Sequence, residues 1–389
     1  MKFDFDETIE RRNTNSIKYG MAAFGKLPEA IPLWVADMDF KTAPCIINAL
    51  QERCDHGIFG YSGIDDEYKE TVSKWFAARH DWSIEHDWLV LAPGVVTAIY
   101  TAVRAFTSPG EAIIINQPVY GPFASSVEQS GRKLVVNELV YDNETYMIDF
   151  DDFEAKIKQE NVKMFILCNP HNPVGRVWAE EELEKLGEIC LKHGVLVVSD
   201  EIHQDFVYDG HKHLVFANLN PNFADIAITC TAPTKTFNIA GLSVSNILIT
   251  NKDLRATFKS EYSKSGLSQI GIMGIVACQA AYSGGADWLD QLNRYIWGNI
   301  TYIDNFLKER IPCVKCVRTE GTFLVWLDFK DLGLSDAELD ELISNKAQLW
   351  LNTGISFGAG GSGFMRLNAG TTRSTLHMAM ERLKTAITG

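Results

Sequence analysis

Short apolar runs alternate with helical patterns through the middle of the chain. The runs predict strands over residues 88–91, 112–115, 164–167, 195–198, 225–231 and 246–250. Nearly continuous apolar runs are typical of strands that are covered on both faces of a parallel sheet. Between them, residues 180–193 have apolar side chains at helical spacing, and Gly194 supplies a C-terminal stop. This alternation predicts an α/β layer fold.

The C-terminal third of the chain has a different pattern. A long helix is expected over 287–310 and a strand over 322–329. Ser335 and Glu338 form a capping box that begins a helix, which we expect to extend to about residue 350. A short strand over 364–367 and a final helix over 373–387 complete the pattern. The mixture predicts a smaller α+β domain, with a boundary near residue 285.

Composition and charge narrow the possible partners. The chain has 389 residues, 46% of them hydrophobic, which is enough for one or two domains. Its net charge is 36 − 50 = −14, so nucleic acid and anionic lipid are not expected partners. The sequence starts Met-Lys-Phe-Asp-Phe-Asp, and its longest weakly polar stretch, 271–282, is too short to span a membrane. We therefore expect a cytoplasmic protein without a membrane partner.

Eight cysteines lie at irregular spacing, and we expect free thiols. Cys313 and Cys316 form a C-x-x-C pair that can serve redox chemistry or bind a metal. No second pair accompanies it, so we expect no metal site.

The segment 232–241 contains the lysine that matters most for function. Lys235 follows an apolar run and precedes a turn that contains Gly241. Such a lysine lies at the carboxyl edge of a sheet, where ligands bind in α/β folds. Taken alone, it can equally be an ordinary surface lysine. Asp200 ends another apolar run, and a carboxylate there can keep the pyridine nitrogen of pyridoxal phosphate (PLP) protonated, although Asp is also a common helix N-cap.

Three further segments place polar or aromatic groups after predicted strands. Two Asn-Pro pairs in 169–173 force an extended, turned loop, in which Asn172 can donate to the phenolic oxygen of PLP. The turn 92–97 leads from a strand into a helix start, and the free N–H groups of Val95 and Val96 suit a phosphate. Tyr120 adds an aromatic ring at the end of a further strand.

Together these segments resemble a known family over nearly the whole chain. The resemblance is to fold-type I PLP enzymes of the class I/II aminotransferase superfamily. Within that superfamily, the chain is similar to the C–S lyases of the cystathionine β-lyase (MalY/PatB/cystalysin) group. The matching motifs lie, in order, at residues 11–19, 33–40, 60–61, 118–120, 169–178, 199–203 and 363–368.

The resemblance implies the architecture, the cofactor and the assembly. The fold is expected to be α/β, with a large PLP-binding domain (46–285) around a mostly parallel seven-stranded sheet. A small α+β domain is expected from residues 1–45 and 286–389. The implied cofactor is pyridoxal 5′-phosphate, and the implied active unit is a homodimer with shared active sites.

The resemblance also assigns residue roles. Lys235 matches the Schiff-base lysine, and Lys235, Tyr61 and Tyr120 are the catalytic candidates. The matching cofactor contacts are Asp200 at the pyridine nitrogen, Asn172 and His203 at the phenolic oxygen, Tyr120 stacked on the ring, and Val95, Val96 and Thr234 at the phosphate. Tyr61 matches a tyrosine that reaches the phosphate of the neighbouring subunit. The matching substrate residues are Ala36, Asn172 and Arg366, whose guanidinium forks onto the α-carboxylate.

Two positions depart from the aminotransferase pattern. Ser243 occupies the place where aminotransferases commonly have a phosphate-binding arginine, which leaves one phosphate contact unassigned. Thr234 replaces the usual serine before the lysine and keeps the hydroxyl. The Ser243 difference favours the C–S lyase group over plain aminotransferases.

The implied reaction is α,β-elimination of L-cystathionine, L-cysteine or a cysteine S-conjugate to a thiol, pyruvate and ammonia. One alternative is an aminotransferase that uses the same residues. Another is a regulatory protein with a PLP-enzyme fold that acts by binding another protein. The sequence does not distinguish the preferred sulfur substrate.

Overall fold

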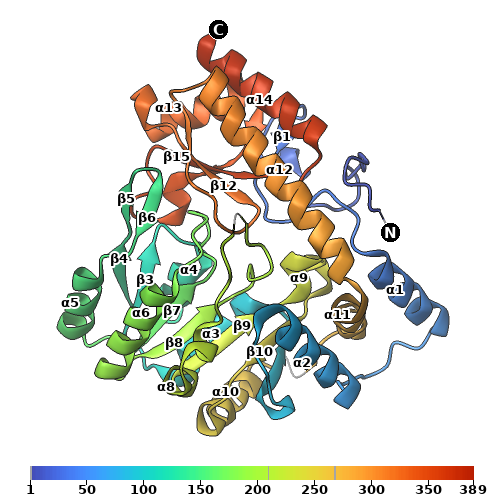
Figure 1. Cartoon of the computed structure of the whole chain (residues 1–389), viewed down its shortest axis with the longest axis vertical. Helices are drawn as coiled ribbons and strands as arrows, with labels where there is room; N and C mark the ends of the chain where they lie inside the picture. The colour runs from blue at the N-terminus through green and yellow to red at the C-terminus, as the bar shows by residue number, and fades with distance from the viewer. Residues whose placement is uncertain (1, 209, 267–268) are drawn as a thin grey trace.

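A seven-stranded sheet forms the centre of the larger part of the molecule (Figure 1). The computed structural model describes residues 2–208, 210–266 and 269–389. The strand order is β2-β10-β9-β8-β7-β3-β4, and β10 runs in the opposite direction to the other six strands of this sheet. The strands are β2 (Leu89–Ala92), β3 (Ala112–Gln117), β4 (Lys133–Glu138), β7 (Met164–Cys168), β8 (Leu196–Asp200), β9 (Ala227–Thr231) and β10 (Ser245–Leu248). The predicted mostly parallel α/β fold is confirmed.

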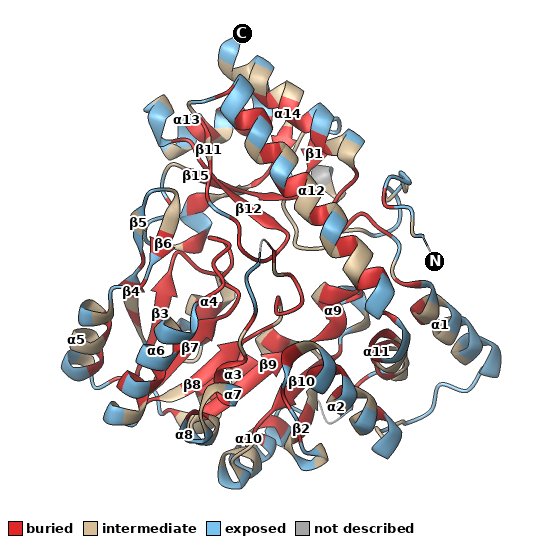
Figure 2. Cartoon of the chain, in the orientation of Figure 1, coloured by how far each residue is buried: buried red, intermediate tan, exposed pale blue. Residues whose placement is uncertain are grey.

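Successive residues of these strands enter two different hydrophobic cores, because side chains alternate along a strand. Ile113 and Ile115 pack with apolar residues of α3 (Val95–Phe106), α4 (Pro122–Glu128) and α10 (Lys252–Lys264). Ile114 lies in the core that also contains apolar residues of α5 (Phe150–Glu160) and α6 (Glu180–His193). Both faces of the sheet are therefore covered, which explains the continuous apolar runs (Figure 2).

The remaining helices of the large part surround this layered core. They are α1 (Pro44–His56), α2 (Asp66–His80), α7 (Phe216–Leu219), α8 (Pro221–Asp225), α9 (Pro233–Thr236) and α11 (Ile272–Gly284). Among the described residues, no helix is both long enough and apolar enough to cross a membrane.

A second, smaller sheet has the order β11-β12-β15-β14 and is antiparallel throughout. Its strands are β11 (Lys315–Cys316), β12 (Leu324–Asp328), β14 (Asn352–Thr353) and β15 (Phe364–Asn368). The long helix α12 (Ala286–Arg310) and the last helix α14 (Arg373–Thr388) accompany it (Figure 1). The predicted division into two domains agrees with this second sheet, and its boundaries stay a prediction.

The helix expected over 335–350 is shorter than predicted. The capping box at Ser335 is present, but α13 (Asp336–Glu341) passes into a π-helical turn over Leu342–Lys346. Leu349–Trp350 then forms strand β13, which pairs in parallel with β1 (Ile31–Pro32). The expectation was wrong at this end because the partner strand lies more than 300 residues earlier in the sequence. This pairing holds the N-terminal segment against the C-terminal part.

Candidate active site

Five strands of the large sheet deliver candidate residues to the same edge. Asp200 ends β8, and Lys235 lies in α9 directly after β9. Tyr120 follows β3, Asn172 follows β7, and Val95 begins α3 after β2. Because these five strands run in one direction, their carboxyl ends meet at one edge, as open α/β sheets require of a ligand site.

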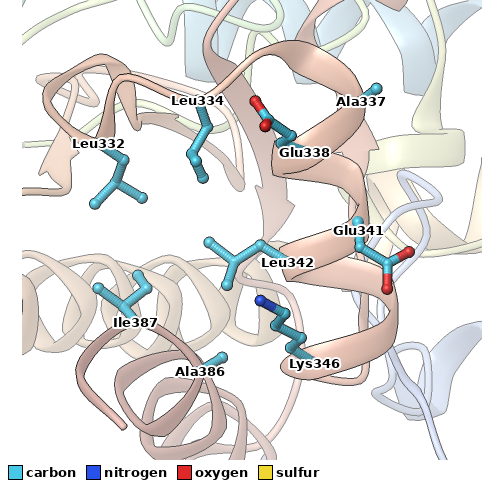
Figure 3. Close-up of a pocket in the computed structure, with 9 residues that line it drawn as sticks. All are labelled: Leu332, Leu334, Ala337, Glu338, Glu341, Leu342, Lys346, Ala386 and Ile387. Carbon is cyan, nitrogen blue, oxygen red and sulfur yellow. The ribbon is translucent and has the colours of Figure 1, made fainter.

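A cavity of about 410 Å³ lies at this edge. It is lined by ten of the eleven residues that the sequence singled out: Ala36, Val95, Val96, Tyr120, Asn172, Asp200, His203, Thr234, Lys235 and Arg366. A larger hollow of about 530 Å³ lies between α13, the π-helical turn and the end of α14 (Figure 3). Apolar side chains dominate its lining, and its charged residues are Glu338, Glu341 and Lys346. The chemistry of the lining, and not the volume, therefore identifies the candidate active site.

Lys235 is placed as a nucleophile and base. Its Nζ donates to the carbonyl oxygen of Ala36 at 2.6 Å. Burial lowers the pKa of the Lys235 amine to about 8, and the cation of Arg366 adds to this effect. An amine with this pKa is partly neutral near physiological pH and can take up a proton.

The turn that carries Lys235 is anchored from behind. The neighbouring Thr236 donates its hydroxyl to Asp205 Oδ2 at 2.7 Å, and His80 Nε2 lies 3.1 Å from Asp205 Oδ1. All three side chains are buried. Sequence reasoning did not find this chain of contacts, because its members lie far apart in the sequence.

Asp200 and His203 are buried polar groups with capacity for a ligand. Asp200 Oδ1 accepts from the Ile202 N–H at 3.1 Å, and burial raises the pKa of its carboxyl to about 7. His203 Nδ1 is buried without a hydrogen-bond partner in the described chain, and burial lowers the pKa of its ring. Buried polar groups are normally satisfied, so both groups indicate a polar ligand.

Within the described parts of the chain, the buried Arg366 cation donates hydrogen bonds only to neutral acceptors. Its guanidinium donates to Asn172 Oδ1 at 3.0 Å, to Asn352 Oδ1 at 2.7 Å and to the Trp34 carbonyl at 2.7 Å. Its Nε has no partner among the described residues, and burial lowers its pKa to about 10. A buried charge without a counter-charge is costly, so this site favours an anionic ligand group.

The turn between β2 and α3 forms a cradle for an anion. The first N–H groups of α3, at Val95 and Val96, have no acceptor within the helix. Gly94 precedes them, and a Cβ placed there would meet nothing within 4 Å. Thr234 also lines this cavity. The open space and the helix N-terminus fit a phosphate group.

Several lining residues were not singled out by sequence. Asn352, which holds Arg366, follows the buried run Leu349–Leu351, and a polar residue after such a run was an available signal. Trp34 lies in a matching motif but received no role; its ring stacks on Trp350 with centroids 4.1 Å apart. The other lining residues without an assigned role are Val35, Pro93, Gly94, Thr97, Cys168, Ile202 and Ala240.

Tyr61 is the candidate residue that this cavity does not include. Its side chain is 95% exposed, on the segment between α1 and α2. It lines a separate surface hollow together with Leu242, Ile270 and Met273. Ser243, also exposed, does not line the cavity either. All eight cysteines, including Cys313 and Cys316, are free thiols.

Comparisons with known proteins agree with this geometry. The family model for aminotransferase class I and II matches residues 28–383. Cystathionine beta-lyase PatB of Bacillus subtilis is 47% identical over 386 residues, which cover 99% of this chain and all of that protein. Cystalysin from Treponema denticola, whose crystal structure contains a pyridoxal 5′-phosphate cofactor, has a TM-score of 0.97 at 39% identity and covers 100% of this chain and 99% of its own. The PLP-bound C–S lyase from Staphylococcus hominis has a TM-score of 0.92 at 34% identity, with the same two coverages.

Proposed function

Because the chain belongs to the class I and II aminotransferase family and is a C–S lyase within it, we propose that it splits sulfur-bearing L-amino acids by α,β-elimination. The substrates we infer are L-cystathionine, L-cysteine and cysteine S-conjugates, and the products are a thiol, pyruvate and ammonia. The observation that carries this proposal is a buried arginine that forms no salt bridge among the described residues and shares one cavity with a buried lysine of lowered pKa.

Pyridoxal 5′-phosphate is the cofactor, and the cavity has groups to match each part of it. Lys235 would hold it covalently, and the Asp200 carboxylate would meet its pyridine nitrogen. Asn172 and His203, whose Nδ1 has no hydrogen-bond partner among the described residues, line the same cavity and would serve its phenolic oxygen. Val95, Val96 and Thr234 would hold the phosphate, and Tyr120 offers an aromatic face. When bound, the cofactor stabilises negative charge that develops at the substrate Cα.

The protein side chains account for binding and proton transfer. Arg366 binds the α-carboxylate through two guanidinium nitrogens, which fixes the amino acid at one end. The neutral Lys235 amine removes the proton from Cα, and its lowered pKa makes this possible near pH 8. The electron pair left at Cα then forms a Cα–Cβ double bond as the Cβ–S bond breaks and the thiolate leaves, and one water molecule hydrolyses the resulting unsaturated amine to pyruvate and ammonia. With the cofactor bound, the Asp200 carboxylate, at the end of β8, would hold a proton at the pyridine nitrogen.

A pyruvate assay coupled to lactate dehydrogenase tests this function. Purified protein with added PLP should release pyruvate from cystathionine and cysteine. Lys235→Ala should lower the rate by about 10³-fold or more, because it removes the base and the covalent anchor. The exposed Lys259→Ala is a suitable control and should retain activity. Absence of pyruvate from every β-thio substrate, together with amino transfer to a keto acid, would instead identify an aminotransferase.

We also propose that the active unit is a homodimer. The segment before α2 exposes Ile58, Phe59 and Tyr61, with 65%, 57% and 95% of their surface accessible. An exposed apolar group of this kind favours a protein–protein contact, and a two-fold pair is the commonest oligomer. In such a pair, Tyr61 would reach the phosphate of the neighbouring site.

A further inference from the structure

One backbone segment touches both key cations of the active site. Lys235 Nζ donates to the carbonyl of Ala36 at 2.6 Å, and Arg366 Nη2 donates to the carbonyl of Trp34 at 2.7 Å. We refer to residues 34–40 as the strap. It has no helix or strand of its own, so its carbonyl directions must be fixed by contacts from outside.

Asn238, three residues after Lys235, binds the strap through its whole side-chain amide. Its Oδ1 accepts from the Met38 N–H at 2.8 Å. Its Nδ2 donates to the carbonyls of Met38 at 2.8 Å and Phe40 at 2.9 Å. Both amide hydrogens and the amide oxygen are therefore used on two strap residues, which leaves this end of the strap little freedom to rotate.

Asn368, two residues after Arg366, also binds the strap. Its Nδ2 donates to the carbonyls of Val35 and Asp37, each at 2.6 Å. These two carbonyls flank Ala36, so the peptide groups on both sides of the Lys235 acceptor are held. Each of the two cations thus has a nearby asparagine in its own segment that binds the strap.

Charged residues of the N-terminal segment also hold the strap. The buried Lys18 pairs with Asp39 at 2.9 Å, and Arg11 pairs with Asp37 at 2.7 Å. Arg11 also donates to the Met38 carbonyl at 3.2 Å. The strap is therefore fixed before any ligand binds, and Lys235 meets a preorganised acceptor.

We propose that Asn238 is a positioning residue that fixes the Ala36 carbonyl against Lys235 Nζ and so sets the place and the hydration of the catalytic amine. The catalytic role of Lys235 rests on the proposed function, whereas its contact with Ala36 is present in the protein without cofactor. Asn368 supports the same carbonyl from the Arg366 side.

The test variant is Asn238→Gly. Asn238 has φ = 56°, a left-handed conformation that glycine adopts without strain, so the change deletes the amide and keeps the turn. Asn238→Asp is the second variant, because it keeps an oxygen for the Met38 N–H and loses both amide donors. Asn137→Ala is the matched control: Asn137 is fully buried and its amide binds Asp149 and Asp152, away from the cavity.

The first readout uses protein without cofactor. The pH dependence of covalent labelling of Lys235, followed by mass spectrometry, gives the pKa of its amine. The charged groups that influence this amine are Arg366 on β15, Asp37 on the strap and Asp200 on β8. Asn238→Gly and Asn137→Ala leave all three unchanged and add no charge, whereas Asn238→Asp adds a carboxylate. We expect the midpoint to rise from about 8 towards the ordinary lysine value in Asn238→Gly, because water reaches the amine, and to stay at the wild-type value in Asn137→Ala.

The second readout uses the enzyme with PLP. We expect kcat to fall roughly 10- to 100-fold in Asn238→Gly, since a displacement of about 1 Å is enough for such a loss. The pH profile of kcat should shift to higher pH by the same amount as the midpoint of Lys235 labelling. A variant in which Met38 exchanges its amide hydrogen faster, but in which the Lys235 midpoint and the pH profile equal those of wild type, would overturn the proposal. Absence of lyase activity in the wild-type protein would refute the proposed function. The labelling result would still decide whether Asn238 positions the Ala36 carbonyl, because it is measured without cofactor.

Discussion

The role of Arg366 depends both on its positive charge and on the planar shape of its guanidinium group. Its guanidinium nitrogens donate hydrogen bonds to Asn172, Asn352 and Trp34. A lysine cannot reproduce this forked arrangement of donors. We expect Arg366→Lys to raise KM for the amino acid roughly 10- to 100-fold, the range of one lost hydrogen bond to a charged group. Steady-state kinetics with cysteine would measure this change.

A half-buried arginine outside the cavity provides the control for that experiment. Arg382 also donates to two backbone carbonyls, those of Glu29 and Gln348. Arg382→Lys should leave KM within about twofold of wild type, because this side chain does not line the cavity. Equal KM values for both variants would argue against carboxylate binding by Arg366.

Asp200 gives the protein without cofactor a characteristic pH dependence. Its folded pKa of about 7 exceeds the unfolded value of 3.8, so between these values the folded state binds more protons than the unfolded state. The free energy of unfolding should therefore fall as pH rises from about 4 to 7, by up to roughly 4 kcal/mol from this group. Asp200→Asn should remove this slope in urea unfolding experiments. The exposed Asp55→Asn should give a curve parallel to that of wild type.

The sequence identified residues whose position follows from a strand end. Lys235, Asp200 and Asn172 come after apolar runs, and parallel strands bring such residues to one edge. Asn238 and Asn352 escaped notice because their roles depend on contacts with segments far away in the chain, such as Met38 and Arg366. The position of Asn352 after a buried run was a signal, but a side-chain amide alone does not show which distant segment it contacts.

Among the elements, the turn from β2 into α3 offers a position where a substitution should affect phosphate binding without disturbing the fold. Gly94 is in an extended conformation that any residue adopts, with φ of 177°, and a Cβ there would enter open space. Gly94→Val should therefore fold normally but occupy the space for the phosphate. We expect the Kd for PLP to rise at least tenfold, with Gly94→Ala intermediate, in a spectroscopic titration. An unchanged Kd would place the phosphate elsewhere.

Helices and strands were predictable where the local sequence pattern determines the secondary structure. Helix α6 begins and ends at the expected residues, because its apolar spacing and Gly194 coincide with the structure. Edge strand β4 and the hairpin of β5 (Val140–Asp142) and β6 (Thr145–Met147) were missed. In β4 buried positions alternate with exposed or half-buried ones, so it lacks the continuous apolar run of a central strand. The predicted end of the 335–350 helix was wrong, because the pairing of Leu349–Trp350 with β1 overrides the local helical pattern.

At the scale of the whole molecule, the homodimer can be tested by complementation. Tyr61→Ala and Lys235→Ala should each be nearly inactive alone. If Tyr61 of one subunit completes the site of the other, a mixed dimer contains one site with both residues intact. Mixing the two variants under conditions of subunit exchange should restore up to about a quarter of the wild-type rate, the statistical expectation for random pairing into two-fold dimers. Exchange verified by mass spectrometry without recovery of activity would exclude a shared site.

The strap also has a consequence for how the protein is made. The Lys235 contact with Ala36 spans 199 residues of sequence, and the Arg366 contact with Trp34 spans 332. During translation the strap emerges early, and its two cationic partners follow long afterwards. A nascent chain that ends before Arg366 therefore has no complete substrate site, whatever part of its sheet has already formed. Contacts of such separation also form slowly in refolding, so catalytic competence should appear after the secondary structure does.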